Sequence, residues 1–229
     1  MNPDDQIVET SRRLSEALAP GDLDRTLASI TATAVAVLPE VEHASITVRH
    51  DDGRLETFAP TDDMLLEVVA AQYDLQVGPC YEAASDSVHV TSPHLAQDPR
   101  FPRYAPVALA AGIRSQAGIR LFDTPASKGA LNLYGVRDGA FLDLGALGPL
   151  FAHQSATAIA YAREVTQLQE ALQTRQVIGQ AVGMVMERFG LDDARAFAFL
   201  ARLSQDNNVK LRVVAERMLA DRDADRPST

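Results

Sequence analysis

The chain has 229 residues, of which 31 are acidic and 21 basic, so its formal net charge at pH 7 is −10. Hydrophobic residues make up 46% of it, which is enough to form a buried core. The sequence contains no run of 18 apolar residues and no signal-peptide pattern, so we expect a cytoplasmic protein without a membrane span. The single cysteine, Cys80, excludes an internal disulfide and any site that needs several cysteines.

The charge is distributed unevenly along the chain. Residues 1–160 carry 11 basic and 21 acidic side chains, whereas residues 161–229 carry ten of each. A net charge of −10 argues against nucleic-acid binding by the chain as a whole, because phosphate contacts favour basic surfaces. All the excess acid lies in the first two thirds, which predicts two parts with different roles.

The first two thirds alternate between helix-like and strand-like patterns. Apolar residues at helical spacing predict helices over 7–19, 23–38, 64–73 and 105–111, the second of them capped by Asp22. Alternation of apolar and polar residues predicts strands over 44–50, 54–59, 88–91, 115–122 and 130–136. Five prolines mark 78–106 as largely loop, and a loop over 123–129 joins the last two strands. Because the connections are short, we expect an antiparallel sheet with helices packed on it, an α+β fold.

From about Leu144 onwards the sequence has a helical pattern throughout. Residues 147–189 contain one proline, Pro149, in the first turn, where it is tolerated, so we predict a single long helix that Gly190 ends. Val165, Leu168 and Leu172 have the spacing of a coiled-coil seam. A helix of this length spans about 60 Å, which one small domain cannot bury. We therefore expect it to bridge two domains, to pair with a partner helix, or both.

Two shorter helices are expected after Gly190. The first begins at 191–193, and its expected core face consists of Ala194, Phe197, Ala198 and Ala201. A turn at 206–208 leads to a third helix over 210–220, whose apolar face consists of Leu211, Val214, Ala215 and Met218. Helical spacing also predicts that the rings of Phe189, Phe197 and Phe199 belong to the core.

Four short motifs in the N-terminal part carry a resemblance to a known family. They are GPCYEA at 78–83, DPRFP at 98–102, GIRS at 112–115 and GALNLY at 129–134. In this order and spacing they resemble the landmarks of a GAF domain over roughly residues 20–160. The resemblance implies a sensor of a small ligand or of a protein partner, with no ligand or cofactor specified.

A second, denser resemblance covers roughly residues 165–225. The sequence IGQAVGMVMERFG at 178–190, followed by DA at 193, AF at 196, LS at 203, NNVKL at 207–211 and VA at 214, looks like an ANTAR domain. ANTAR domains bind RNA as dimers, recognise paired hairpins and prevent transcription termination. With the predicted N-terminal helix placed at 1–20, the resemblances imply a GAF-like domain at 21–160, and a long, partly coiled-coil helix leading into a three-helix ANTAR domain at 161–225.

The resemblance directs attention to two sets of RNA-binding candidates. On the long helix they are Arg175, Gln180, Gly183 and Arg188, and at the start of the third helix Asn207, Asn208, Lys210 and Arg212. Gly183 costs about 1 kcal/mol relative to alanine inside a helix, which close helix packing or a bare backbone facing RNA would explain. A helix N-terminus attracts phosphate, although asparagines also serve ordinary turns. Many ANTAR domains have a lysine where this chain has Val182.

Three other classes of function stay open at the level of the sequence. A DNA-binding regulator would also use a helical C-terminal domain. A thiol or redox site could combine Cys80 with His89 or His94, and a haem could be ligated by one of the five histidines, His43, His50, His89, His94 and His153. A pure protein-interaction module needs no ligand at all. We expect no catalytic residue and no metal site, since no ligand spacing suggests one.

Overall fold

The computed structural model describes residues 12, 22–38, 40–85, 87–142 and 147–224. The predicted helix over 7–19 therefore lies outside the described residues, apart from Arg12. The chain divides into two compact units, Met1–Arg163 and Glu164–Thr229. Within the described residues no helix is long and apolar enough to cross a membrane.

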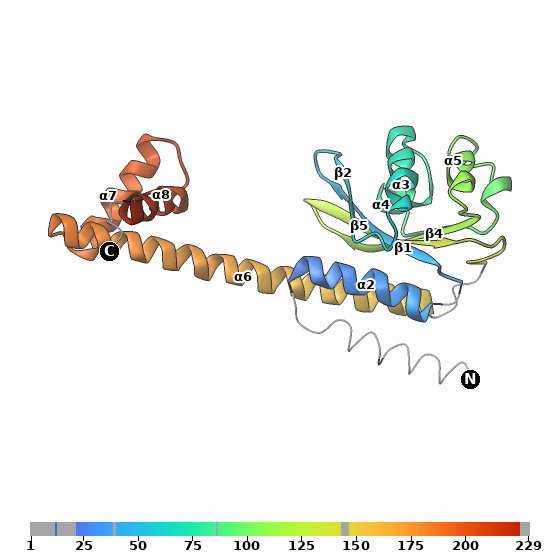
Figure 1. Ribbon diagram of the computed structural model, residues 1–229, viewed down its shortest axis with the longest axis horizontal. Helices are drawn as coiled ribbons and strands as arrows, with labels where there is room; N and C mark the ends of the chain where they lie inside the picture. Colours follow the sequence, from blue (N-terminus) through green and yellow to red (C-terminus); the bar gives the residue numbers. More distant parts are fainter. Residues whose placement is uncertain (1–11, 13–21, 39, 86, 143–146, 225–229) are drawn as a thin grey trace. The chain divides into compact units, whose positions relative to one another are not determined.

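The first unit is built on a five-stranded antiparallel sheet with strand order β2-β1-β5-β4-β3 (Figure 1). The strands are β1 (His43–His50), β2 (Leu55–Phe58), β3 (His89–Ser92), β4 (Ser115–Asp123) and β5 (Ser127–Gly135). In the central pair Ile46 of β1 lies opposite Leu131 of β5. The predicted α+β fold with an antiparallel sheet is confirmed.

Helices cover both faces of this sheet. They are α2 (Leu23–Val37), α3 (Met64–Leu75), α4 (Pro79–Ser85), α5 (Ala105–Ala110) and the first part of α6 (Leu147–Phe189). Helices α2 and α6 lie on one face, and α3, α4 and α5 on the other (Figure 1). Two predictions were wrong here. The stretch 78–106 contains α4 as well as loops, and β5 begins at Ser127, so the loop after β4 is shorter than 123–129.

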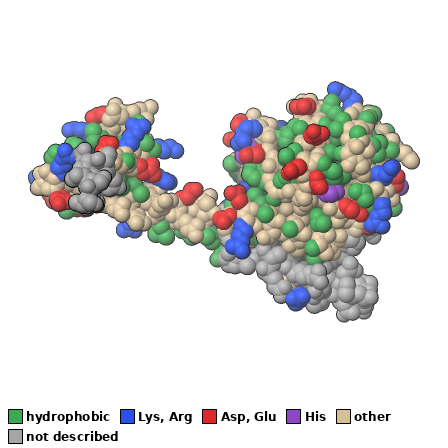
Figure 2. All heavy atoms as spheres, viewed as in Figure 1, with side chains coloured by type: hydrophobic (Ala, Val, Ile, Leu, Met, Phe, Trp, Pro, Cys, Tyr) green, Lys and Arg blue, Asp and Glu red, His purple; other side chains and the backbone are tan. Residues whose placement is uncertain are grey.

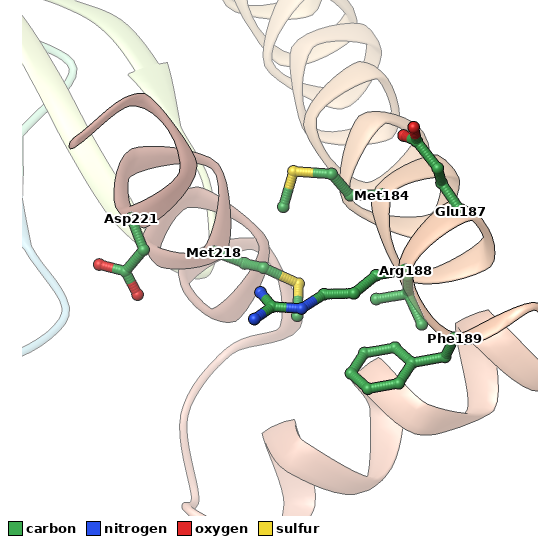
Figure 3. Close-up of a pocket in the computed structure, with 7 residues that line it drawn as sticks. Met184, Glu187, Arg188, Phe189, Met218 and Asp221 are labelled. Atoms are coloured by element: carbon green, nitrogen blue, oxygen red, sulfur yellow. The ribbon is translucent and has the colours of Figure 1, made fainter. Parts of the chain in front are cut away.

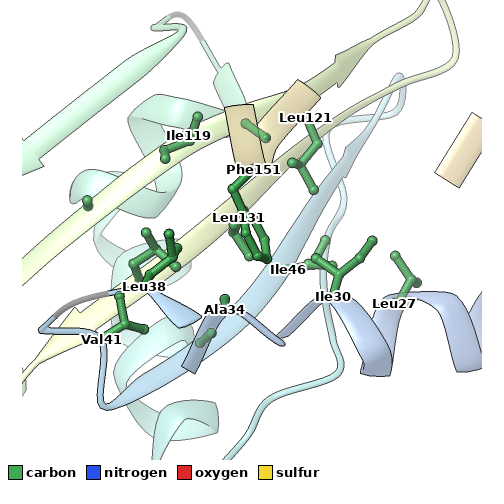
Figure 4. Packing of buried hydrophobic residues seen from close by; sticks show 14 of the residues in the cluster. Leu27, Ile30, Ala34, Leu38, Val41, Ile46, Ile119, Leu121, Leu131 and Phe151 are labelled. Atoms are coloured by element: carbon green, nitrogen blue, oxygen red, sulfur yellow. The ribbon is translucent and has the colours of Figure 1, made fainter. Parts of the chain in front are cut away.

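The sheet separates two cores of different character. Between the sheet and helices α2 and α6, aliphatic side chains such as Ile30, Ile46 and Leu131 pack around the Phe151 ring (Figure 4). On the opposite face, Phe101, Tyr104 and Tyr134 are fully buried beneath α3, α4 and α5. The second core thus differs from the first in holding buried tyrosines, whose hydroxyl groups need hydrogen-bond partners.

The DPRFP motif forms a compact hydrogen-bonded corner around the Asp98 carboxylate. This group accepts hydrogen bonds from Ser92 Oγ at 2.7 Å, from the Arg100 backbone N–H at 3.0 Å and from the Arg100 guanidinium at 2.6 Å. The guanidinium also donates to the Thr91 carbonyl and lies over the Phe101 ring, 4.8 Å from its centroid. The motif therefore joins β3 to the following loop.

Replacing Asp98 by asparagine is expected to lower the free energy of unfolding by about 2 kcal/mol at pH 7, because charge-assisted hydrogen bonds are lost. Burial alone raises the pKa of Asp98, but the hydrogen bonds from Arg100 and Ser92 outweigh it and bring the pKa to about 2. The carboxylate therefore stabilises the fold above about pH 4, and this stabilisation is lost as the pH falls towards 2.

Urea unfolding at pH 7 and at pH 2.5 measures this contribution. The deficit of the Asp98→Asn variant should be large at pH 7 and small at pH 2.5. Asp138→Asn is the matched control, since that half-exposed carboxylate contacts only the Arg114 guanidinium among the described residues, at 3.7 Å. An equal deficit for both variants would contradict the proposed role of Asp98.

Candidate nucleic-acid interface

The second unit is a small three-helix domain. It consists of the C-terminal part of α6, α7 (Asp193–Asp206) and α8 (Leu211–Ala224). Its buried core consists of Ala181, Val182, Val185, Ala196, Leu200 and Ala215. Gly190, in the left-handed conformation with φ of +64°, ends α6, and the Asp192 side chain caps α7 by accepting from the Arg195 backbone N–H at 2.8 Å. Val182, where many ANTAR domains have lysine, belongs to this core.

The face of α7 that meets the core differs from the predicted one. Ala196 and Leu200 are buried, whereas Ala194, Phe197 and Ala198 are exposed and Ala201 is half-buried. The prediction for α8 was closer, since Ala215 is buried and Leu211, Val214 and Met218 pack against the core. The domain is too small to bury more than one narrow stripe of each helix.

The three phenylalanines of this unit are exposed, which contradicts the predicted core positions. The exposed fractions are 52% for Phe189, 47% for Phe197 and 37% for Phe199. Residues two positions apart on a helix face away from each other, so Phe197 and Phe199 cannot both point into one core. The rings of Phe189 and Phe199 instead contact each other, with centroids 5.6 Å apart and planes tilted by 42°.

Gly183 has no packing partner among the residues that the structure describes. A Cβ atom built at Gly183 or at Gly179 meets nothing within 4 Å, and both residues are exposed on α6. Close packing inside the domain therefore does not explain either glycine. Gln180 and Arg175 are also exposed on this helix. The open side of α6 is thus available to a partner outside the protomer.

Replacing Gly183 by alanine is expected to raise the free energy of unfolding by about 1 kcal/mol, because alanine has the higher helix propensity and its methyl group meets no neighbour. Thermal unfolding of the full chain measures this. Gly190→Ala is the control and should lower the free energy of unfolding, since the φ of +64° at Gly190 disfavours any residue with a side chain. If Gly183→Ala leaves RNA affinity unchanged, Gly183 is not a point where RNA approaches the backbone.

The connection between α7 and α8 holds the second set of candidates. The Asn207 side chain donates to the Leu203 carbonyl at 2.8 Å, and Asn208 adopts a positive φ of 50°. The Ser204 hydroxyl donates to the Val209 carbonyl at 2.6 Å and braces the loop. The asparagines therefore shape the turn, and this fixed turn presents the exposed side chain of Lys210 at the start of α8.

The candidate cations differ in whether a carboxylate of the protein already pairs with them. The Arg212 guanidinium donates to the Glu216 carboxylate at 2.7 Å, so its charge is already paired. Among the described residues, the ion pairs of this unit are Arg195–Asp192 and Arg212–Glu216, so Lys210 and Arg188 have no carboxylate within ion-pair distance. Arg188 extends towards Met218 of α8 and lies beside a groove between the two helices (Figure 3). The charge of Arg212 is thus less available to a phosphate than the charges of Lys210 and Arg188.

The surface of the second unit carries both signs of charge. Basic and acidic side chains are interspersed over the face seen in Figure 2, with apolar patches between them. This agrees with the ten basic and ten acidic residues of 161–229. Any phosphate contact of this unit therefore depends on individual cations such as Lys210 rather than on a broad basic surface.

The geometry around Cys80 does not suit a reactive thiol. Its Sγ lies 2.6 Å from the Gln116 amide nitrogen and 3.3 Å from the Tyr134 hydroxyl, and Tyr104 donates to the other end of the Gln116 amide. Burial raises the pKa of the Cys80 thiol to about 12, so it stays protonated at neutral pH. No histidine is bonded to it within the described part of the chain.

The histidines do not converge either. His43 and His50 are half-buried, and His89, His94 and His153 are exposed. In the described ranges, no group of three or more metal-ligating side chains could hold a metal ion. The second unit therefore offers the stronger candidate site.

Comparison with protein families identifies the C-terminal unit. The model of the ANTAR domain matches residues 166–219. None of the curated proteins compared with the chain matches it. An ANTAR domain implies an RNA-binding antitermination regulator.

Solved structures match the fold at low sequence identity. The GAF domain of a phosphoenolpyruvate-protein phosphotransferase from Coxiella burnetii is 15% identical, with a TM-score of 0.55, over 72% of this chain and 99% of that one. SdiA from Escherichia coli is 12% identical, with a TM-score of 0.53, over 93% and 96%. The bacteriophytochrome from R. palustris is 13% identical, with a TM-score of 0.60, over 94% and 46%. The chain therefore combines a domain of GAF-like fold with a C-terminal ANTAR domain, which is a GAF–ANTAR architecture.

Proposed function

We propose that this protein binds hairpin RNA as a dimer through its ANTAR domain, and that its GAF-like domain controls this binding in response to a signal. The observation that carries the proposal is the ANTAR match over 166–219. Transcription antitermination, or another control of the message, is the resulting activity, and it takes place in the cytoplasm where transcripts are made.

In this proposal Lys210 makes the main contact with the RNA backbone. This side chain is exposed at the start of α8, where the positive end of the helix dipole adds to its charge. Arg212 joins it if RNA phosphate competes with Glu216 for the guanidinium. Asn207 and Asn208 hold the turn, and Gln180, Arg175, Gly183 and Arg188 supply contacts from α6.

Dimer formation in this proposal uses the open side of α6. In the protomer Leu168 is 59% exposed and Leu172 is 68% exposed, although both are large and apolar, and Val165 is half-buried. Helical geometry places Gly179 and Gly183 in the same sector as these leucines. A second copy of α6 would cover the seam of Val165, Leu168 and Leu172, and the two glycines lie beyond the C-terminal end of this seam.

The signal is a small molecule or a protein partner. A ligand shifts an equilibrium only if it binds one state better than the other, so the signal must favour one arrangement of the α6 helices. Since α6 begins in the first unit and continues into the second, it is the covalent link along which the GAF-like domain influences the ANTAR dimer.

Selection from an RNA pool with two randomised hairpin loops tests the proposal. The full chain should enrich related loop sequences, and the selected twin-hairpin RNA should bind more tightly than either hairpin alone. Duplex DNA of the same sequence is the comparison that separates the DNA-binding alternative. Tight, sequence-specific binding to the duplex, or no RNA binding at any salt concentration, would overturn the proposal.

A further inference from the structure

The exposed ring of Phe189 lines one side of a groove. The groove lies between the end of α6 and α8, has a volume of about 580 Å³, and is lined by Met184, Val185, Glu187, Arg188, Phe189, Met218 and Asp221. Figure 3 shows the side chains of Arg188 and Met218 next to the Phe189 ring, with Met184 farther along α6. The groove therefore combines apolar and charged side chains with an aromatic ring that remains half exposed.

The charges of the groove favour a base over a phosphate. Among the residues that the structure describes, Arg188 is the one cation of this lining, which also includes the carboxylates of Glu187 and Asp221. Two carboxylates against one guanidinium repel a phosphate group. A nucleobase is uncharged, has an apolar face that stacks on a phenyl ring, and has polar edges that can meet charged groups.

The neighbouring face of α7 adds arginines to the aromatic pair. Arg195 and Arg202 stand four residues before and three residues after Phe199, so helical spacing puts all three on one side of α7. Arg202 is exposed. The Nε atom of Arg195 lies 3.6 Å from a carboxylate oxygen of Asp192, the residue that caps α7. Aromatic rings interleaved with arginines are the side chains on which unpaired RNA bases stack.

We propose that the groove beside Phe189 takes one unpaired base of a bound RNA hairpin loop, which stacks on the Phe189 ring while Phe199 supports that ring from α7. The inference rests on the proposed function, since it assigns a base-reading site to the same RNA-binding domain. It separates two tasks within the ANTAR domain. Lys210 contacts the backbone, and the Phe189 groove contacts a base.

Fluorescence of 2-aminopurine tests this inference. The probe is the selected twin-hairpin RNA with 2-aminopurine placed at each loop position in turn, bound to the full chain. One position should change its fluorescence on binding, because stacking alters the environment of that base. Phe189→Ala should abolish the change and weaken affinity by about 5- to 150-fold, the range for loss of one base–aromatic stack.

Several variants keep the inference falsifiable. Phe189→Tyr retains a ring and should retain both signals, whereas Phe189→Leu fills the space without a ring and should lose them. Phe197→Ala is the matched control, since its ring is also exposed on α7 and has no aromatic contact within the described residues. The salt dependence of affinity should not change in Phe189→Ala, because no phosphate contact is lost.

The failures of the two proposals are distinguishable. If the wild-type chain binds no RNA, the proposed function fails. If it binds RNA and Phe189→Leu binds equally well with an unchanged fluorescence signal, only the base site is overturned. A change of sedimentation coefficient in Phe189→Leu would show that the ring belongs to an interface between protein copies, which would also overturn the base site.

Discussion

Replacing Leu172 by glutamate is expected to separate the proposed dimer and to weaken binding to twin-hairpin RNA by about 100-fold or more. Two linked sites commonly gain a factor of 10² to 10⁴ over one, and this gain disappears when the link is broken. A carboxylate in each copy of the seam brings two like charges together in an apolar contact. Leu172 is largely exposed in the protomer, so the fold of each copy should survive.

Sedimentation velocity and RNA titrations measure this prediction together. The Leu172→Glu chain should sediment as a monomer and should bind the twin-hairpin RNA about as weakly as it binds one hairpin. Gln173→Glu is the matched control, because it adds the same charge at the next exposed position, turned about 100° around the helix. If the Leu172→Glu chain remains dimeric, the seam lies elsewhere.

The regular elements of the fold could be predicted because the sequence signals for them are local. Helix α6 is a single long helix that ends at Phe189 as expected, since no proline follows its first turn and Gly190 ends it. Asp22 caps α2 through the Arg25 backbone N–H at 2.8 Å, as its position before the apolar repeat predicted. The strands follow from alternation of apolar and polar residues, a signal that needs no knowledge of the partner strand.

The elements that were missed depend on tertiary contacts. Helix α4 has only seven residues, begins at Pro79 and has five buried side chains, so its stability comes from packing against the sheet rather than from its own pattern. The core face of α7 was misplaced because alanines on several sides of that helix fit a small core equally well. Only the structure shows that Ala196 and Leu200 meet the core.

In the candidate site, too, the residue types could be predicted from the sequence, but their contacts could not. The sequence resemblance picked out Lys210, Arg212 and Arg188 but could not show that Arg212 pairs with Glu216 or that Arg188 lies beside a groove. The exposed Phe189 was missed because an apolar residue at helical spacing is usually core. The two-residue spacing of Phe197 and Phe199 was the available signal that not every ring could be buried.

The placement of Lys210 leads to the second large effect, which is on the salt dependence of RNA binding. Each phosphate contact contributes about 0.7 to 0.9 to the slope of log affinity against log salt concentration. A dimer carries Lys210 twice, so Lys210→Ala should lower the magnitude of the slope by up to about twice that amount. Affinity at low salt should fall for all loop sequences alike, because a backbone contact carries no sequence information.

Titrations of the full chain with twin-hairpin RNA at several salt concentrations provide the measurement. Lys210→Arg keeps the positive charge and should therefore keep the wild-type slope of log affinity against log salt concentration. Arg212→Ala should have a smaller effect, because the Glu216 carboxylate already neutralises that guanidinium in the free protein. Arg137→Ala removes an exposed cation from the first unit and should leave the slope unchanged. If Lys210→Ala keeps the wild-type slope, phosphate is bound elsewhere, and the start of α8 is then a turn built for folding rather than for RNA.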